Sequence, residues 1–268
     1  MTSLPPPSPK KLGLVIDLDT CVGCHACAVA CKEWNDGGQF GPLPDEDAYG
    51  AQPHGVWFNR VHGYAVDGPG TGGAAGAGRR AGNQETPIPD SGLTVHFPRS
   101  CLHCETPACV TVCPTGASYK RAEDGIVLVD ADQCIGCQLC AWACPYGARE
   151  FSVERGTMQK CTLCVDRIYN ETLDEADRQP ACVMACPTRA RHFGDLGDAQ
   201  SPVSKLVAER DGYALMPEYG YRPVNRYLPP RPRKAGCGDV PACGGEGESL
   251  DPASLPGVLR WLDRVLSR

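Results

Sequence analysis

The sequence predicts an α+β fold built from small units that are organised around cysteines. Three observations lead to this fold class: four tight cysteine groups, an internal repeat, and short apolar strands that precede two of the groups. Eighteen of the 268 residues are cysteines, and 16 of these fall into the four groups. Such a cysteine count is typical of disulfide-rich or metal-binding domains.

The spacing within the groups, which we call cassettes one to four, decides between these classes. The first and third read C-x2-C-x2-C-x3-C, the second lengthens one gap to four residues, and the fourth has 17 residues between its second and third cysteines. This is the spacing of bacterial ferredoxins, in which three thiolates of one loop bind a cubane iron–sulfur cluster and the fourth points to a second cluster. The cassettes are Cys21-Cys24-Cys27-Cys31, Cys101-Cys104-Cys109-Cys113, Cys134-Cys137-Cys140-Cys144 and Cys161-Cys164-Cys182-Cys186.

Haem and zinc are the alternative uses of these cysteines. The stretch CVGCH at residues 21–25 matches the motif for covalent haem attachment. A haem would leave Cys27 and Cys31 unexplained, whereas a cluster uses the whole cassette, so we expect His25 to be a loop residue beside the cluster. A zinc site needs only four ligands and gives no reason for a fourth cysteine followed by proline, which recurs at Pro114, Pro145 and Pro187.

An internal repeat supports ferredoxin-like units. Residues 15–31, VIDLDTCVGCHACAVAC, align with residues 128–144, LVDADQCIGCQLCAWAC. We expect short strands at 12–17 and 125–130, and helical segments at 28–33 and 141–144 that carry the fourth cysteine. The prediction is therefore two nested bacterial-ferredoxin-like units, each with two [4Fe–4S] clusters.

The segments between the cassettes complete the predicted division of the chain. A stretch rich in Gly and Pro is expected to be a flexible insertion, because it cannot offset the entropy of ordering. Cys237 and Cys243 fit no cassette, and residues 255–266 place apolar side chains on one helical face. The division is an outer unit at 11–66 and 150–200 with cassettes one and four, the insertion at 67–92, an inner unit at 93–149, and a C-terminal extension at 201–268 that contacts partner subunits.

Composition and motifs limit the function. A net charge of −6 argues against nucleic acid as a partner. No run reaches the roughly 20 apolar residues that span a bilayer, and the first residues lack the apolar core of a signal peptide, so we expect a soluble chain in a reducing compartment. No nucleophile–base pair or nucleotide-binding motif is found, which predicts electron transfer without a catalytic site or a direct small-molecule substrate. Basic residues beside the cassettes are expected to offset cluster charge: Lys32, Arg149, Lys160, Arg167, Arg189 and Arg191.

The order of the cassettes resembles the iron–sulfur subunits of the dimethyl sulfoxide reductase superfamily over residues 12–228. Within that family, CVGCHAC, HFPRSCLHCETPACVTVCPTGASYKR, CPYGARE and YALMPEYGYRPVNRYLPPRP are most similar to sulfite dehydrogenase iron–sulfur subunits. The resemblance implies a complex of three subunits: a molybdopterin catalytic subunit, this chain, and an integral membrane anchor that exchanges electrons with quinone. Because cassette three has four cysteines, with none replaced by tryptophan, four [4Fe–4S] clusters are expected.

The family pairs cassette one with four and cassette two with three, and this implies the ligands of each cluster. Site 1 is Cys21, Cys24, Cys27 and Cys186; site 2 is Cys134, Cys137, Cys140 and Cys113; site 3 is Cys101, Cys104, Cys109 and Cys144; site 4 is Cys161, Cys164, Cys182 and Cys31. The expected location is the cytoplasmic face of the inner membrane, or the periplasm after co-export with the catalytic subunit. The alternatives are a subunit of a polysulfide, thiosulfate, dimethyl sulfoxide or arsenate reductase, or a free polyferredoxin.

Overall fold

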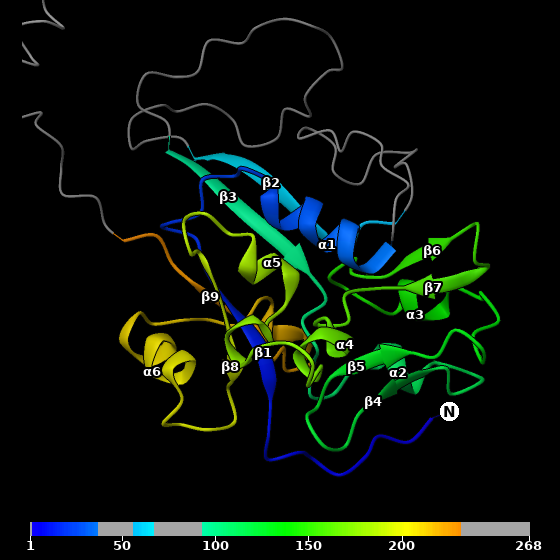
Figure 1. The fold of residues 1–268 in the computed structure, drawn as a ribbon. Coiled ribbons are helices and arrows are strands. Elements are labelled where there is room, and N and C mark those ends of the chain that lie inside the picture. Colours follow the sequence, from blue (N-terminus) through cyan, green and yellow to red (C-terminus); the bar gives the residue numbers. More distant parts are fainter. Residues whose placement is uncertain (1, 37–55, 67–92, 232–268) are drawn as a thin grey trace, which may run out of the picture. The chain divides into compact units, whose positions relative to one another are not determined.

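The computed structural model describes residues 2–36, 56–66 and 93–231, which form an α+β fold of short helices and small sheets (Figure 1). The features below lie in the compact unit Met1–Pro230. The helices are α1 (Ala26–Asp36), α2 (Ala108–Thr111), α3 (Leu139–Trp142), α4 (Val165–Ile168), α5 (Ala181–Met184) and α6 (Pro202–Glu209), with 3-10 turns at Glu175–Asp177 and Pro217–Tyr219. The strands are β1 (Leu12–Asp17), β2 (Asn59–Val66), β3 (Leu93–Ser100), β4 (Ser118–Lys120), β5 (Val127–Val129), β6 (Glu150–Ser152), β7 (Thr157–Gln159), β8 (Arg191–Asp195) and β9 (Arg226–Leu228).

Strand β1 is the centre of a three-stranded sheet. It pairs antiparallel with β8 and parallel with β9, and all six of its residues are buried. A continuous apolar run is what a strand covered on both faces requires. Leu14 and Ile16 are completely buried, and the burial of each side chain stabilises the folded state by about 1.5–3 kcal/mol. The predicted strand at 12–17 is confirmed; the one at 125–130 is present but shorter, as β5.

Helix packing brings distant cassettes together. Helix α1 carries Cys27 and Cys31 and packs against α5, which carries Cys182. In the same way α2 of cassette two packs against α3 of cassette three. Cassette one therefore lies beside cassette four, and cassette two beside cassette three.

The helix predicted at 141–144 is wrong at its end. Helix α3 stops at Trp142, so Cys144 lies beyond it, whereas Cys31 lies inside α1. Pro145 follows Cys144, and the residue before a proline is disfavoured in helical conformation. The fourth cysteine of cassette three is thus carried by the loop after the helix.

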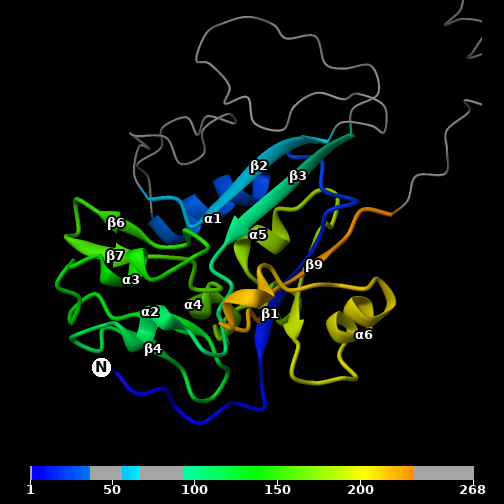
Figure 2. The same ribbon diagram turned by 180° about the vertical axis from the view of Figure 1, so that it is seen from behind.

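The segment that ends in β9 belongs to the protein's own core. Strand β9 lies beside β1 in both ribbon views (Figure 2). The fully buried ring of Tyr227 stacks on Phe97 with ring centroids 4.5 Å apart, and its hydroxyl donates to the carbonyl oxygen of Pro98 at 3.1 Å. Such aromatic pairs add about 0.5–1.5 kcal/mol beyond their buried area. Part of the predicted extension at 201–268 therefore stabilises the fold itself.

Several predicted features lie outside the described residues: the insertion at 67–92, Cys237, Cys243 and the helix at 255–266. Within the described part of the chain, every helix is too short or too polar to cross a membrane.

Candidate iron–sulfur cluster sites

One backbone feature is shared by all four cassettes. The residue before the second cysteine has a positive φ in each: 68° at Gly23, 46° at His103, 68° at Gly136 and 55° at Leu163. This left-handed conformation is free for glycine and strained for a bulky side chain. This conformation recurs at the same position of all four loops, and in two of them the residue is not glycine. The four loops therefore share one turn conformation.

Site 1 is a hollow at the start of α1. The four cysteines that the sequence assigned to it, from cassettes one and four, all line one solvent-open cavity of about 320 Å³. The backbone N–H of Ala190 donates to Sγ of Cys186 at 3.2 Å. His25 lines the same cavity, next to the cysteines as predicted. Burial raises the pKa of Cys21.

Site 2 has the same construction in cassettes two and three. Its four predicted cysteines line a second hollow of about 300 Å³. Sγ of Cys113 accepts from the N–H of Ser118 at 3.3 Å, and Sγ of Cys134 accepts from the N–H of Met158 at 3.4 Å. Burial favours the neutral thiol of Cys113, but its hydrogen bonds outweigh burial and lower its pKa.

Site 3 is deeper in the molecule. Burial raises the pKa of Cys104, and the nearby charges of Cys101, Cys109 and Cys144 raise it further. Burial also raises the pKa of Cys109, and the charges of Cys101 and Cys144 act in the same direction. All four predicted cysteines of this site therefore lie within electrostatic reach of one another.

Site 4 joins helix α1 to cassette four. Cys31 is buried, and after burial itself the charges of Cys161, Cys182 and Cys164 are the largest causes of its raised pKa. Asn35 lies one helical turn after Cys31, and its Nδ2 donates to Sγ of Cys31 at 3.6 Å and to Sγ of Cys164 at 3.7 Å. One amide thus bridges the two cassettes that the cross-pairing prediction joins.

The donor sets fit a four-iron cluster. Each site has four thiols, one for each iron of a cubane, and backbone N–H groups donate to sulfur at sites 1, 2 and 4. Burial raises the pKa of Cys161 to about 12 and of Cys182 to about 11, so binding a cluster there must release protons. In the described residues, no three His, Cys, Asp or Glu side chains form a group that could hold a single metal ion.

Comparison with known proteins matches these sites. Residues 93–196 match the family model of the 4Fe–4S dicluster domain, and residues 12–33 match the 4Fe–4S binding domain. The chain is 54% identical over 221 residues to a sulfite dehydrogenase subunit of Allochromatium vinosum, covering 82% of this chain and 84% of that protein. It is 37% identical to a tetrathionate reductase subunit of Salmonella typhimurium, covering 82% of this chain and 74% of that protein. It is 34% identical to a polypeptide of the anaerobic dimethyl sulfoxide reductase of Escherichia coli, covering 86% and 94%.

The chain belongs to the iron–sulfur electron-transfer subunits of the dimethyl sulfoxide reductase family of molybdoenzymes. The resemblance found in the sequence is thereby confirmed.

Other residues of this iron–sulfur subunit support the cysteine loops, and the sequence alone did not reveal them. Asn225 is completely buried, accepts from the N–H of Leu14 at 2.9 Å, and donates to the carbonyl oxygen of Cys101 at 3.1 Å. His103 is also buried, and its Nδ1 accepts from the N–H of Val127 at 3.1 Å. Both join cassette two to strands far away in the sequence. Their signal in the sequence is only a polar residue next to apolar ones, which is common at surfaces too.

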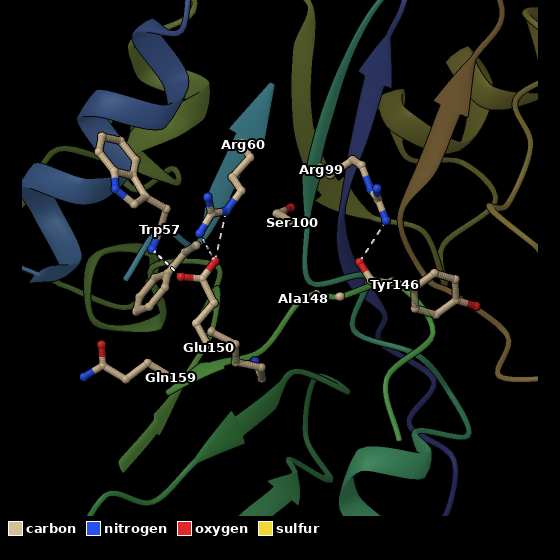
Figure 3. A pocket seen from close by; sticks show the side chains of 11 residues that line it. Trp57, Arg60, Arg99, Ser100, Tyr146, Ala148, Glu150 and Gln159 are labelled. Carbon is tan, nitrogen blue, oxygen red and sulfur yellow. Dashed lines mark hydrogen bonds and ion pairs between the residues drawn. The ribbon is translucent and has the colours of Figure 1, made fainter. Parts of the chain in front are cut away.

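A hollow of about 270 Å³ lies between the β2–β3 pair and the segment after cassette three (Figure 3). Glu150 accepts from the N–H of Trp57 at 2.9 Å and pairs with Arg60, whose Nη2 lies 2.5 Å from Oε1. On the other side, Nη2 of Arg99 donates to the carbonyl oxygen of Tyr146 at 3.0 Å. The Glu150 contacts hold residues 57–60 to residue 150 within the predicted outer unit, and the Arg99 contact lies within the predicted inner unit.

Proposed function

We propose that this subunit holds four [4Fe–4S] clusters in two nested ferredoxin-like units and relays electrons between two partner subunits. The observation that carries the proposal is the gathering of the 16 cassette cysteines into four sets of four. Each set takes three members from one cassette and its fourth member from another, which is the cross-ligation of two-cluster ferredoxins. In this proposal sites 1 to 4 are ligated as the family pairing implies.

Electrostatic interactions between neighbouring sites support a single row. Sites 1 and 4, sites 4 and 3, and sites 3 and 2 each share one pair of cysteines whose charges act on each other, and no such pair joins more distant sites among the shifts described. The proposed order is therefore site 1, site 4, site 3, site 2. The three pairs are Cys27 with Cys182, Cys161 with Cys101, and Cys140 with Cys109.

The two ends of this row are the places where partners fit. Cys24 of site 1 and Cys137 of site 2 are exposed, in contrast to the buried cysteines of site 4. Next to them, Val22 is 57% exposed and Ile135 is 66% exposed, at equivalent positions of the repeat. Large exposed apolar side chains around a site are typical of a protein interface. We assign the two ends to a molybdopterin catalytic subunit and to an integral membrane anchor that reacts with quinone.

The chemistry of this subunit is electron transfer without a substrate of its own. A bound cubane accepts or gives up one electron at a time. The chain fixes the thiolates through its left-handed loop residues, donates N–H groups to sulfur, and buries the middle of the row away from water. A cytoplasmic position at the inner membrane is proposed, with the periplasm after co-export as the alternative.

Sulfite is the proposed substrate of the complex, and sulfite dehydrogenase its activity. The support is the 54% identity to a sulfite dehydrogenase subunit, against 37% and 34% to subunits of tetrathionate and dimethyl sulfoxide reductases. A free polyferredoxin is less well supported, because the relatives match over most of their length and are subunits of complexes by name.

The relay is tested by breaking one link. Membranes that contain the complex with Cys134→Ser should oxidise sulfite with an artificial acceptor that reacts at the molybdenum subunit, while quinone reduction falls to background. Cys237→Ser, outside every predicted site, is the matched control and should leave both reactions intact. Iron and sulfide analysis should find about 16 of each per wild-type chain.

Two results would contradict the proposal. If the isolated wild-type chain oxidises sulfite, the subunit is not a relay. If the complex ignores sulfite and reduces polysulfide or a sulfoxide, the relay is kept and the substrate is wrong.

A further inference from the structure

Three buried cations lie among the cluster sites: Arg191, Lys160 and Arg149 are only 3%, 2% and 6% exposed. The other basic residues beside the cassettes have different surroundings. Lys32 is also buried, at 2% exposed, but it donates to the carbonyl oxygen of Val56 and lies over the ring of Trp57. Arg167 lies over the ring of Trp34, and Arg189 is exposed. The structure therefore divides the six cations named from the sequence into two kinds.

Arg191 lies between sites 1 and 4. It lines the hollow of site 1, and its charge acts on Cys27 of that site and on Cys31 and Cys182 of site 4. Its Nη2 donates to Oδ1 of Asn59 at 2.6 Å. Its Nε and Nη1 are buried and have no hydrogen-bond partner among the described residues.

Lys160 lies between sites 4 and 3. It directly precedes Cys161 of site 4, and its charge also acts on Cys101 and Cys109 of site 3. Its Nζ donates to the carbonyl oxygen of Cys161 at 2.6 Å and to that of Val127. Burial lowers the pKa of this lysine, and negative charge on Cys101 and Cys161 acts in the opposite direction.

Arg149 lies between sites 3 and 2. Its Nη2 donates to Sγ of Cys109 of site 3 at 3.1 Å and to Oγ of Ser118 at 2.7 Å. The charge of the same guanidinium also acts on Cys140 of site 2. Its Nε and Nη1 are buried and, like those of Arg191, have no partner in the described part of the chain.

A buried cation needs negative charge nearby, because leaving water costs several kcal/mol unless the charge is compensated. None of these three forms an ion pair with a carboxylate of the described residues. The groups around them that can carry negative charge are the cysteine sulfurs and, beside Arg191, the hydroxyl of Tyr227. Arg, Lys and Arg thus occupy the three gaps of the row in turn, one cation to each gap.

We propose that Arg191, Lys160 and Arg149 each place one positive charge between two neighbouring clusters and raise the reduction potentials of both. The proposal rests on the four-cluster function and goes further, since it assigns each potential to particular side chains. Reduction adds one electron to a cluster and takes its charge, with four thiolates, from about −2 to about −3, and no bond forms or breaks. A fixed cation favours the more negative state, so it stabilises the reduced form.

The test is a potentiometric titration of the full complex, followed by electron paramagnetic resonance, with dithionite as reductant. Signals are first assigned to the two ends with Cys24→Ser and Cys137→Ser. Arg191→Gln should then lower the potentials of sites 1 and 4 alone, Lys160→Gln those of sites 4 and 3, and Arg149→Gln those of sites 3 and 2. We expect at least a tenfold fall in the ratio of reduced to oxidised cluster at a set potential, which is about 59 mV for one electron.

Matched controls separate charge from packing. Arg191→Lys, Lys160→Arg and Arg149→Lys keep the charge and should keep the potentials. Lys205→Gln removes one positive charge from an exposed position of α6 and should change no potential. One outcome is that a Gln variant loses iron while the variant that keeps the charge at the same position binds all its clusters and has wild-type reduction potentials. That result supports the requirement for a positive charge in that gap.

Three outcomes would overturn the proposal: unchanged potentials in loaded Gln variants, an equal shift at all four sites, or equal loss of iron in the Gln and charge-keeping variants. Failure of the underlying function has a different signature. Wild-type chain with fewer than four clusters by iron, sulfide and spin counting would refute the four-cluster proposal whatever the variants do.

Discussion

The two copies of the internal repeat share their loop and differ in what surrounds it. Gly23 and Gly136 have the same φ of 68°, and the residues two positions later, His25 and Gln138, have φ values of 59° and 61°. Before each loop an aspartate accepts from the N–H two residues later, at 2.9 Å in both copies. Local sequence is therefore enough to repeat the loop to within a few degrees.

The surroundings differ because the first copy is covered and the third cassette is not. Asp17 is buried and pairs with Arg210, whereas the equivalent Asp130 is only half-buried and forms no ion pair with the described residues. Helix α1 has 11 residues and packs on α5 and β2, whereas α3 has four residues and presents Trp142, 89% exposed, to solvent. The two loops thus have the same conformation but different surroundings. Equivalent substitutions in the two copies should therefore change stability by different amounts.

The largest difference in stability between equivalent substitutions is expected at the two loop glycines, Gly23 and Gly136. A Cβ on Gly136 would lie 2.6 Å from the backbone oxygen of Gly156, whereas the three atoms nearest to a Cβ on Gly23 belong to the side chain of His96, the closest at 2.3 Å. The backbone of Gly156 cannot move away from the added methyl group, whereas the half-buried imidazole of His96 can rotate. We therefore expect Gly136→Ala to lower the free energy of unfolding by about 3 kcal/mol and Gly23→Ala by about 1 kcal/mol. The check is the denaturant midpoint of the loaded chain, followed by cluster absorbance. Equal midpoints for the two variants would show that the contact with Gly156 is not limiting.

The aspartates give the next effect. Asp17→Ala removes the nearer of the two carboxylates that pair with Arg210, whose Nη1 lies 3.1 Å from Oδ2 of Asp17, and should lower the free energy of unfolding by about 2 kcal/mol. Asp130→Ala removes only an exposed turn contact and should change the midpoint much less. Thermal unfolding of the two variants measures this, and Arg210→Ala should resemble Asp17→Ala. A larger loss at Asp130 would reverse the comparison.

The smallest effect on stability is expected at exposed apolar residues of the two copies. Val29 is 49% exposed and Trp142 is 89% exposed at equivalent positions. Replacing either by serine should change stability by less than about 0.5 kcal/mol. Each should weaken the binding of a different partner subunit, by about tenfold if the side chain is an interface anchor. The check is co-purification of each variant with the two partner subunits. The row with two partner ends would be contradicted if both variants keep both partners, or if both variants lose the same partner.

Much of this site could be predicted from the sequence, because cysteine spacing and the repeat are local. The loops, the strand at 12–17 and the resemblance to iron–sulfur subunits all follow from short motifs. The positive φ of His103 and Leu163 could not be predicted, since local preference opposes it and the surrounding fold imposes it.

Long-range contacts were also beyond the sequence. The sequence indicates six cations near cassettes, but only the fold distinguishes Lys160, buried between two sites, from Arg189, which is exposed. The end of α3 was missed although Pro145 marks it, because the alignment with the first copy suggested a longer helix. Asn35 and Asn225 act across more than 100 residues, a separation at which a single sequence has no signal.

Cross-ligation is the central claim, and spectra of single-cysteine variants test it most directly. Cys31 belongs to cassette one by sequence and to site 4 in this account. The reduced complex with Cys31→Ser should therefore lose or alter the same electron paramagnetic resonance signal as the complex with Cys164→Ser, and keep the signal that Cys24→Ser removes. A Cys31→Ser spectrum that matches Cys24→Ser would show that cassette one closes on its own cluster, and would contradict the account.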